Sequence, residues 1–176
     1  LRGGIPICWP WFGQLEKNPT EIQAQINSPQ APAHGFVRER DWQLDRIEAL
    51  DGNTTRASLS LHLDAESEPL WPFKCRLELD MVIAESLSVT FRVFNLSAQT
   101  FHYSTALHSY FAVEAIDQVA VTGLEECQYV DCLDNWQSLI QQGPVSIDQE
   151  VDRQCRHGGD RARVVGVIGR LFAAEQ

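Results

Sequence analysis

Long apolar runs are missing from this chain of 176 residues, and so is an excess of positive charge. No stretch approaches the roughly 18 consecutive apolar residues of a transmembrane helix, and no signal peptide is visible. Aspartate and glutamate number 24 against 14 lysines and arginines, which gives a net charge of −10. This balance argues against non-specific nucleic-acid binding, which needs a basic surface. An anionic substrate would have to be bound by a local group of arginines.

Several signatures of catalytic and metal sites are also missing. The five cysteines form no Cys-x-x-Cys pair, and their odd number argues against a zinc ribbon or a disulfide framework. A reduced, cytoplasmic setting fits this cysteine usage better. The chain has no phosphate-binding glycine loop, no His-Glu-x-x-His and no Gly-x-Ser-x-Gly. His102 and His108 as metal ligands, or Ser104 and Ser109 as hydrolase nucleophiles, are therefore the less favoured interpretations.

A strong helical period is absent as well, and from Asp41 to Val113 apolar residues alternate with polar ones. The alternation is clearest over residues 58–63, 76–83 and 88–93. Alternation with a period of two indicates strands that bury one face. Asp51-Gly52 and Ala84-Glu85-Ser86 are typical of the turns between such strands. The sequence therefore predicts an antiparallel all-β fold, a sandwich or a similar architecture of several sheets.

The other segments give weaker signals. We expect a strand over 100–106, short strands over 119–122 and 144–147, and polar loops over 14–33 and 131–142, the first with a helical turn around 20–26. The first 13 residues are rich in Gly, Pro and aromatics, which predicts neither a helix nor a regular strand. Their aromatic side chains offer flat faces to a sugar, although packing in the core is the favoured interpretation.

Composition changes sharply at Arg153. Residues 153–176 hold five arginines and two acidic residues, whereas residues 1–152 hold nine lysines and arginines and 22 acidic residues. We therefore expect one domain over residues 1–153 and a divergent tail over residues 154–176. An arginine-rich tail can contact phosphate, but a solvated or artefactual end is the favoured interpretation.

The candidate functional residues are dispersed along the chain. His108 stands in an apolar and aromatic segment, where a histidine is either a buried, hydrogen-bonded residue or a proton donor facing a ligand. The other candidates lie beside glycines or in a charged turn: Arg2, His34, Arg38 and Asp152. Two arginines can clamp a phosphate, and histidines and an aspartate can hydrogen-bond sugar hydroxyls. Gly35, between a histidine and an aromatic residue, lets the backbone approach a neighbouring segment closely.

Four motifs carry a more specific signal. They are Arg2-Gly-Gly-Ile-Pro-Ile-Cys-Trp-Pro-Trp-Phe-Gly13, Ala33-His-Gly-Phe-Val-Arg38, Ala106-Leu-His-Ser-Tyr-Phe111 and Val151-Asp-Arg153. In this order and spacing they resemble the glucose-6-phosphate 1-epimerases, which are hexose-6-phosphate mutarotases related to the aldose 1-epimerases. The resemblance implies an antiparallel β-supersandwich and interconversion of the α and β anomers of a hexose 6-phosphate such as glucose 6-phosphate. It implies no metal and no organic cofactor.

The resemblance also implies a role for each candidate residue. His108 would be the catalytic histidine, the general acid toward the ring oxygen. Arg2 and Arg38 would bind the substrate and its phosphate, and His34 would line the pocket. Asp152 would be the substrate-binding aspartate, with Asp131 as the less favoured alternative.

The resemblance leaves one catalytic group unassigned. The general base of the family is a glutamate on a late strand, and the sequence ends at Gln176 before that position. Strands expected before Arg2 are missing too, so we expect a fragment, a supersandwich incomplete at both ends with exposed sheet edges. The alternative to an active isomerase is a non-catalytic module that binds sugar phosphates.

Overall fold

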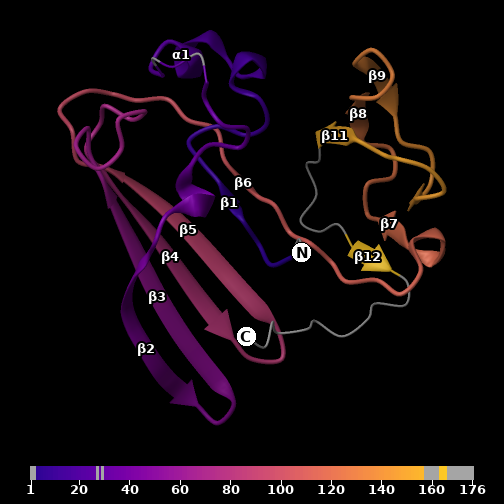
Figure 1. Ribbon diagram of the computed structural model, residues 1–176. Coiled ribbons are helices and arrows are strands. Elements are labelled where there is room, and N and C mark those ends of the chain that lie inside the picture. Colours follow the sequence, from indigo (N-terminus) through magenta and orange to yellow (C-terminus); the bar gives the residue numbers. More distant parts are fainter. Residues whose placement is uncertain (1–2, 27, 29, 157–162, 166–176) are drawn as a thin grey trace. The chain divides into compact units, whose positions relative to one another are not determined.

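The computed structural model describes residues 3–26, 28, 30–156 and 163–165. Within these ranges strands dominate, and the helices are α1 (Thr20–Gln23) and three 3-10 turns, Leu15–Lys17, Val37–Glu39 and Ile116–Gln118 (Figure 1). All ladders between named strands are antiparallel, so the antiparallel all-β prediction is confirmed. No described helix has both the length and the apolar character that crossing a membrane requires. Contacts divide the chain into two units, residues 5–108 and residues 1–4 with 109–176, which are described separately.

A four-stranded sheet forms most of the unit of residues 5–108. Its strands are β2 (Gln43–Asp51), β3 (Thr54–Leu63), β4 (Cys75–Ile83) and β5 (Leu87–Asn95), and they lie side by side in chain order (Figure 1). The turns predicted at Asp51-Gly52 and Ala84-Glu85-Ser86 connect neighbouring strands of this sheet. Consecutive hairpins therefore account for its whole topology.

The alternating sequence pattern separates the two faces of this sheet. Leu79 pairs with Leu59 on β3 and with Phe91 on β5, so apolar side chains meet across three strands on one face. On the other face Asp80 accepts hydrogen bonds from Ser58 and, at 2.7 Å, from Arg92. A strand places successive side chains on opposite faces, so the alternation in the sequence produces one apolar and one polar face of the sheet.

The core beside this sheet contains a cluster of aromatic side chains. Trp9, Trp11, Trp71 and Phe36 are all buried. The Trp9 ring centroid lies 4.7 Å from that of Trp71 and 6.3 Å from that of Phe36, both in edge-to-face arrangements. Such contacts add to the large apolar area that each ring removes from water. The expectation that the N-terminal aromatics pack in the core is confirmed for Trp9 and Trp11.

A short ladder ties the N-terminal loop to the segment that carries His108. β1 (Ile7–Cys8) pairs with β6 (Ala106–Leu107), so the N-terminal loop contains a two-residue strand and the strand expected over 100–106 is confined to its end. Pro10 has no N–H and cannot extend the ladder. Its carbonyl instead accepts a hydrogen bond from the Ser104 N–H at 3.0 Å. Loop contacts therefore replace most of the predicted strand.

The second unit holds two three-stranded antiparallel sheets, of order β10-β7-β12 and β11-β8-β9. Their strands are β7 (Ala120–Thr122), β8 (Gln128–Asp131), β9 (Gln137–Ile140), β10 (Val145–Ser146), β11 (Arg153–Arg156) and β12 (Arg163–Val165). The short strands predicted over 119–122 and 144–147 correspond to β7 and β10.

β9 contradicts the polar loop expected over 131–142. All four of its residues are exposed, so no buried face imposes an apolar alternation that the sequence could show. β11 spans the expected boundary between residues 153 and 154 and pairs with β8. The division into a domain and a divergent tail stays a prediction.

Candidate functional site

The His34-Gly35 segment lies directly against the backbone of Trp9. Gly35 has a φ of 67°, and a Cβ atom at this position would stand 2.1 Å from the Trp9 carbonyl oxygen. The same oxygen accepts hydrogen bonds from the N–H groups of Phe36 at 3.2 Å and Val37 at 3.4 Å. Only glycine fits such an approach in the left-handed region. The close backbone approach predicted at Gly35 is confirmed.

His34 is held by two hydrogen bonds to one residue. The backbone N–H of His34 donates to the Gly13 carbonyl at 2.7 Å, and the backbone N–H of Gly13 donates to Nδ1 of the His34 ring at 3.2 Å. In a neutral imidazole one nitrogen accepts while the other carries the proton. Because Nδ1 accepts here, the network assigns the proton of neutral His34 to Nε2. His34 therefore presents an N–H donor at its far nitrogen.

The structure brings His34 and His108 together, although they are far apart in the sequence. Their ring centroids lie 5.7 Å apart in an edge-to-face arrangement. His108 follows β6 directly, and its N–H donates to the Pro6 carbonyl at 2.9 Å. Phe12 is 39% exposed, and its ring centroid lies 5.1 Å from that of His34 and 6.4 Å from that of His108. Two imidazoles and one exposed aromatic face thus form a site suited to proton transfer beside an apolar ring surface.

Arg38 supplies positive charge near this pair. Its Nη2 donates to the Ala33 carbonyl at 3.1 Å, and its Nε lies 3.8 Å from the Glu39 carboxylate. Burial lowers the pKa of His34, and the charges of Arg38 and His108 lower it further. A histidine with a lowered pKa stays neutral at pH 7, which agrees with the Nε2–H donor.

Two of the candidate residues are not part of this cluster as described. Arg2 lies outside the described residues. Asp152 belongs to the unit of residues 109–176, where its side chain is exposed and its carbonyl accepts from the Cys132 N–H at 2.9 Å. The weaker alternative, Asp131, lies on β8 with its carboxylate 3.8 Å from the Nε of Arg153. His34, Arg38 and His108 are the candidates that one unit assembles.

Asn18 and Ser104 contribute to the site in a way that the sequence did not indicate. The Phe12 N–H donates to Ser104 Oγ at 2.9 Å, and Asn18 Nδ2 donates to the Phe12 carbonyl at 2.8 Å. Ser104 Oγ donates to Asn18 Oδ1 at 2.6 Å. Its one proton is committed to that bond, which weakens further the interpretation of Ser104 as a nucleophile. No local pattern marks these two residues as a pair, because Ser104 comes from a segment far along the chain from Phe12 and Asn18.

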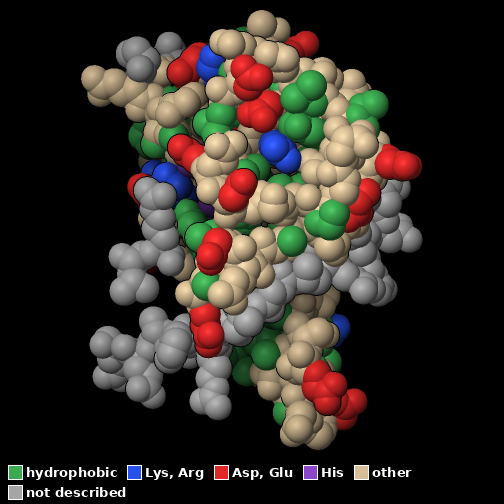
Figure 2. Space-filling model, turned by 90° about the vertical axis from the view of Figure 1, so that its right-hand side faces the viewer, with side chains coloured by type: hydrophobic (Ala, Val, Ile, Leu, Met, Phe, Trp, Pro, Cys, Tyr) green, Lys and Arg blue, Asp and Glu red, His purple; other side chains and the backbone are tan. Residues whose placement is uncertain are grey.

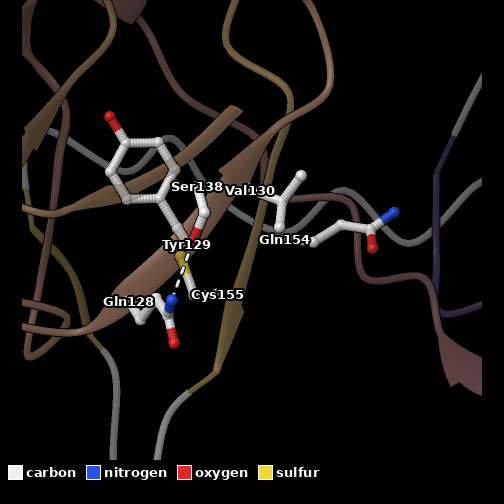
Figure 3. Close-up of a pocket in the computed structure, with 6 residues that line it drawn as sticks. All are labelled: Gln128, Tyr129, Val130, Ser138, Gln154 and Cys155. Atoms are coloured by element: carbon white, nitrogen blue, oxygen red, sulfur yellow. Dashed lines mark hydrogen bonds between the residues drawn. The ribbon is translucent and has the colours of Figure 1, made fainter. Parts of the chain in front are cut away.

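The pocket shown in Figure 3 belongs to the other unit and holds none of the candidate residues. It encloses about 390 Å³ between β8, β9 and β11, and its lining residues are Gln128, Tyr129, Val130, Ser138, Gln154 and Cys155. Gln128 Nε2 donates to Ser138 Oγ at 2.8 Å, the dashed line in the figure. The lining has no histidine, carboxylate or basic side chain. Its chemistry does not suit acid–base catalysis on a sugar phosphate.

No metal site was found in the described part of the chain, and the face drawn in Figure 2 carries more acidic than basic side chains. Among residues 3–26, 28, 30–156 and 163–165, no group of three or more His, Cys, Asp and Glu side chains could hold a metal ion. Figure 2 shows acidic side chains at many places on the face drawn, with fewer basic ones. A phosphorylated ligand would therefore depend on individual arginines such as Arg38.

The chain is similar to curated proteins named "Putative glucose-6-phosphate 1-epimerase". The protein of Cenchrus ciliaris is 32% identical over 165 residues, which cover 87% of this chain and 45% of that protein. The protein of Escherichia coli (strain K12) is 29% identical over 154 residues, which cover 87% of this chain and 47% of that protein. The chain thus spans about half the length of the curated relatives it matches.

Solved structures show the same relationship at the level of the fold. The "putative mutarotase (YeaD)" of Salmonella typhimurium matches with a TM-score of 0.71 and 27% identity, covering 87% of this chain and 46% of that one. The Slr1438 protein of Synechocystis matches with a TM-score of 0.69 and 23% identity, covering 87% of this chain and 52% of that one. The predicted mutarotase-type β fold is confirmed. The aldose 1-epimerase family matches residues 1–165, and the chain belongs to this family.

Proposed function

We propose that the protein interconverts the α and β anomers of a hexose 6-phosphate, with glucose 6-phosphate as the first candidate. The observation that carries the proposal is the His34–His108 pair, 5.7 Å apart beside Phe12, in a chain of the aldose 1-epimerase family. The names of the relatives support the phosphorylated substrate. The proposed enzyme is an isomerase of carbohydrate metabolism that needs neither a metal nor an organic cofactor.

In the proposed reaction His108 acts as the general acid. It donates a proton to the ring oxygen while a carboxylate removes the proton of the anomeric hydroxyl, and the ring opens to the aldehyde. Rotation about the bond between C1 and C2 exposes the other face, and reversal of the two proton transfers closes the ring. General acid–base steps of this kind contribute about 10² to 10⁴-fold each.

The other candidate residues bind the sugar phosphate in this proposal. The Nε2–H of His34 donates to a sugar oxygen near the reacting centre. Arg38 and Arg2 bind the phosphate, and Asp152 accepts from a sugar hydroxyl. The proposal assigns the catalytic carboxylate to no residue of this chain, so the second candidate is a module that binds a sugar phosphate without turnover.

Exchange spectroscopy by NMR on glucose 6-phosphate tests both candidates in one experiment. Exchange between the anomers faster than in buffer supports the isomerase, and saturable shift changes with no faster exchange support the binding module. We expect His108→Asn to abolish the catalysed exchange and to leave binding mostly intact. Exchange that survives this substitution would refute the role of His108, and a chain that binds no sugar phosphate would refute both candidates.

We also propose a cytoplasmic location and a small-molecule substrate rather than a nucleic acid. The odd number of cysteines, without a Cys-x-x-Cys pair, suits a reducing compartment. The net charge of −10 opposes a polyanionic partner. Fractionation of the host cell, followed by detection of the protein, tests the location.

A further inference from the structure

One peptide group connects the Asn18 side chain with the imidazole of His34. This group joins Phe12 to Gly13, so the Phe12 carbonyl is one of its ends and the Gly13 N–H is the other. The carbonyl accepts from Asn18 Nδ2 at 2.8 Å, and the N–H donates to His34 Nδ1 at 3.2 Å. The peptide is planar, so a rotation that breaks one of these bonds breaks the other too.

Ser104 holds the preceding peptide group of the same loop. Its Oγ accepts from the Phe12 N–H at 2.9 Å and donates to Asn18 Oδ1 at 2.6 Å. Asn18 Nδ2 also donates to the Gln14 carbonyl at 2.9 Å. The backbone carbonyl of Asn18 accepts from Gln23 Nε2, on α1, at 2.6 Å. The two side chains therefore fix Phe12 at both of its backbone polar groups and anchor the loop to α1.

We propose that Asn18 and Ser104 are positioning residues that set the tautomer and orientation of His34 beside His108. Asn18 holds the peptide between Phe12 and Gly13, and Ser104 holds the preceding peptide and the Asn18 side chain. The Gly13 N–H thereby meets Nδ1, which leaves the proton of neutral His34 on Nε2. The catalytic consequence rests on the proposed function, in which this Nε2–H meets the substrate. The structural consequence, the tautomer of His34, does not depend on that function.

The same unit offers a matched network, and the hydrogen bonds that define it lie within residues 95–99. Ser97 Oγ donates to Asn95 Oδ1 at 2.7 Å, and Asn95 Nδ2 donates to the Gln99 carbonyl at 2.8 Å. This network uses the same residue types and the same kind of hydrogen bonds as Asn18 and Ser104. Substitutions at Asn95 and Ser97 therefore report what the loss of such a network does to the unit in general.

The decisive measurement is the tautomer of His34 by NMR on the full chain with ¹⁵N-labelled histidine. We expect Nε2–H in the unsubstituted protein. In Asn18→Ala and Ser104→Ala we expect the ratio of tautomers to shift toward Nδ1–H by about fivefold to tenfold, the equivalent of one hydrogen bond. Asn95→Ala and Ser97→Ala should leave the ratio unchanged. An unchanged ratio in both site variants, or an equal shift in the controls, would overturn the proposal.

Two conservative variants keep the test meaningful if an alanine variant does not fold. Ser104→Thr retains the hydroxyl and should keep the tautomer ratio of the unsubstituted protein. Asn18→Asp keeps the acceptor for Ser104 but cannot donate to the Phe12 carbonyl, so it should shift the tautomer ratio toward Nδ1–H. Anomer exchange should fall about tenfold in Ser104→Ala and recover in Ser104→Thr. If the unsubstituted chain shows no exchange, the proposed isomerase activity fails while the tautomer of His34 still decides the positioning role.

Discussion

His34 depends on its neighbours for its ionisation state. Arg38 and His108 both act on an imidazole whose pKa burial already lowers. We expect Arg38→Gln to raise the pKa of His34, because one positive charge that disfavours the imidazolium is removed. An NMR titration of the His34 ring measures the shift. Arg92→Gln, on the polar face of the sheet, is the control that should leave the titration in place.

The lowered pKa of His34 also makes the stability of the folded chain depend on pH. The folded pKa of His34 lies below 6.5, its ordinary value, so the unfolded chain binds the proton more readily. The stabilising contribution of neutral His34 to the unfolding free energy is therefore fully present above pH 6.5, and it is lost as the pH falls through the pKa of the folded state. Arg38→Gln should weaken this dependence in urea unfolding followed between pH 7 and pH 5. A steeper dependence in that variant would contradict the assigned cause.

Gly35 and Gly13 form a matched pair for separating strain from steric exclusion. Their φ angles are 67° and 68°, but a Cβ on Gly35 meets the Trp9 carbonyl and a Cβ on Gly13 meets nothing within 4 Å. We expect Gly13→Ala to cost about 1 to 2 kcal/mol of unfolding free energy, the cost of a left-handed alanine. Gly35→Ala should cost more than about 3 kcal/mol, because the backbones must also separate. Equal losses in urea unfolding would refute the close approach.

At the scale of elements, an ion pair joins the 3-10 turn Val37–Glu39 to the connection between β3 and β4. Arg40 follows the turn, and both its Nε, at 2.9 Å, and its Nη2 donate to the Glu68 carboxylate. Glu68 is only 2% exposed, and its other oxygen accepts from the Leu70 N–H at 3.3 Å. The Arg40 guanidinium also lies over the Phe36 ring, 5.4 Å from its centroid. This pair fixes the end of the segment that carries His34.

We expect Glu68→Gln to lower the unfolding free energy by about 1.5 to 3 kcal/mol, because a buried charge-assisted pair is replaced by a neutral contact. Arg92→Gln is the matched control, since its bond to Asp80 lies on an exposed face and should contribute less than about 1 kcal/mol. Urea unfolding of both variants measures the difference. A loss in the control as large as in Glu68→Gln would show that burial does not set the strength of the pair.

At the scale of the whole molecule, the cysteines differ between the two units. Cys8 and Cys75 are buried in the unit of residues 5–108, whereas Cys127, Cys132 and Cys155 in the other unit are half-buried. Burial raises the pKa of Cys75 to about 11, and it also raises the pKa of Cys8, Cys132 and Cys155. A raised pKa slows modification because the thiolate is the reactive form, and a reagent must in addition reach the sulfur, which is fully buried in Cys8 and Cys75 alone among the five.

We therefore expect a thiol reagent to label the unit of residues 109–176 first. Mass spectrometry of peptides after timed labelling in native buffer gives the order, and labelling in urea gives the reference rates. Cys8 and Cys75 should be modified last in the folded protein and at ordinary rates in urea. Early labelling of Cys75 in native buffer would show that the core of residues 5–108 opens readily.

The sequence by itself determined those features whose physical cause is local. Alternation over 58–63, 76–83 and 88–93 predicted the strands of the four-stranded sheet, since a strand exposes every second side chain to one face. The motifs around His34 and His108 indicated the family, which the comparisons confirmed. β9 was not predicted, because an exposed strand needs no apolar pattern. Backbone hydrogen bonds, which leave no mark in the sequence, form its pairing.

Only the tertiary structure decided how the candidate residues meet. It placed His34 beside His108, put Phe12 against both rings, and used the hydrogen-bond network of Asn18 and Ser104 to orient the imidazole. Most of these contacts join segments distant in the chain, and the side chains of the network are of types common in any polar loop. The sequence therefore showed which types of residue could form the site. Which ring nitrogen of His34 carries the proton is decided by the Gly13 N–H, which only the fold brings to the imidazole.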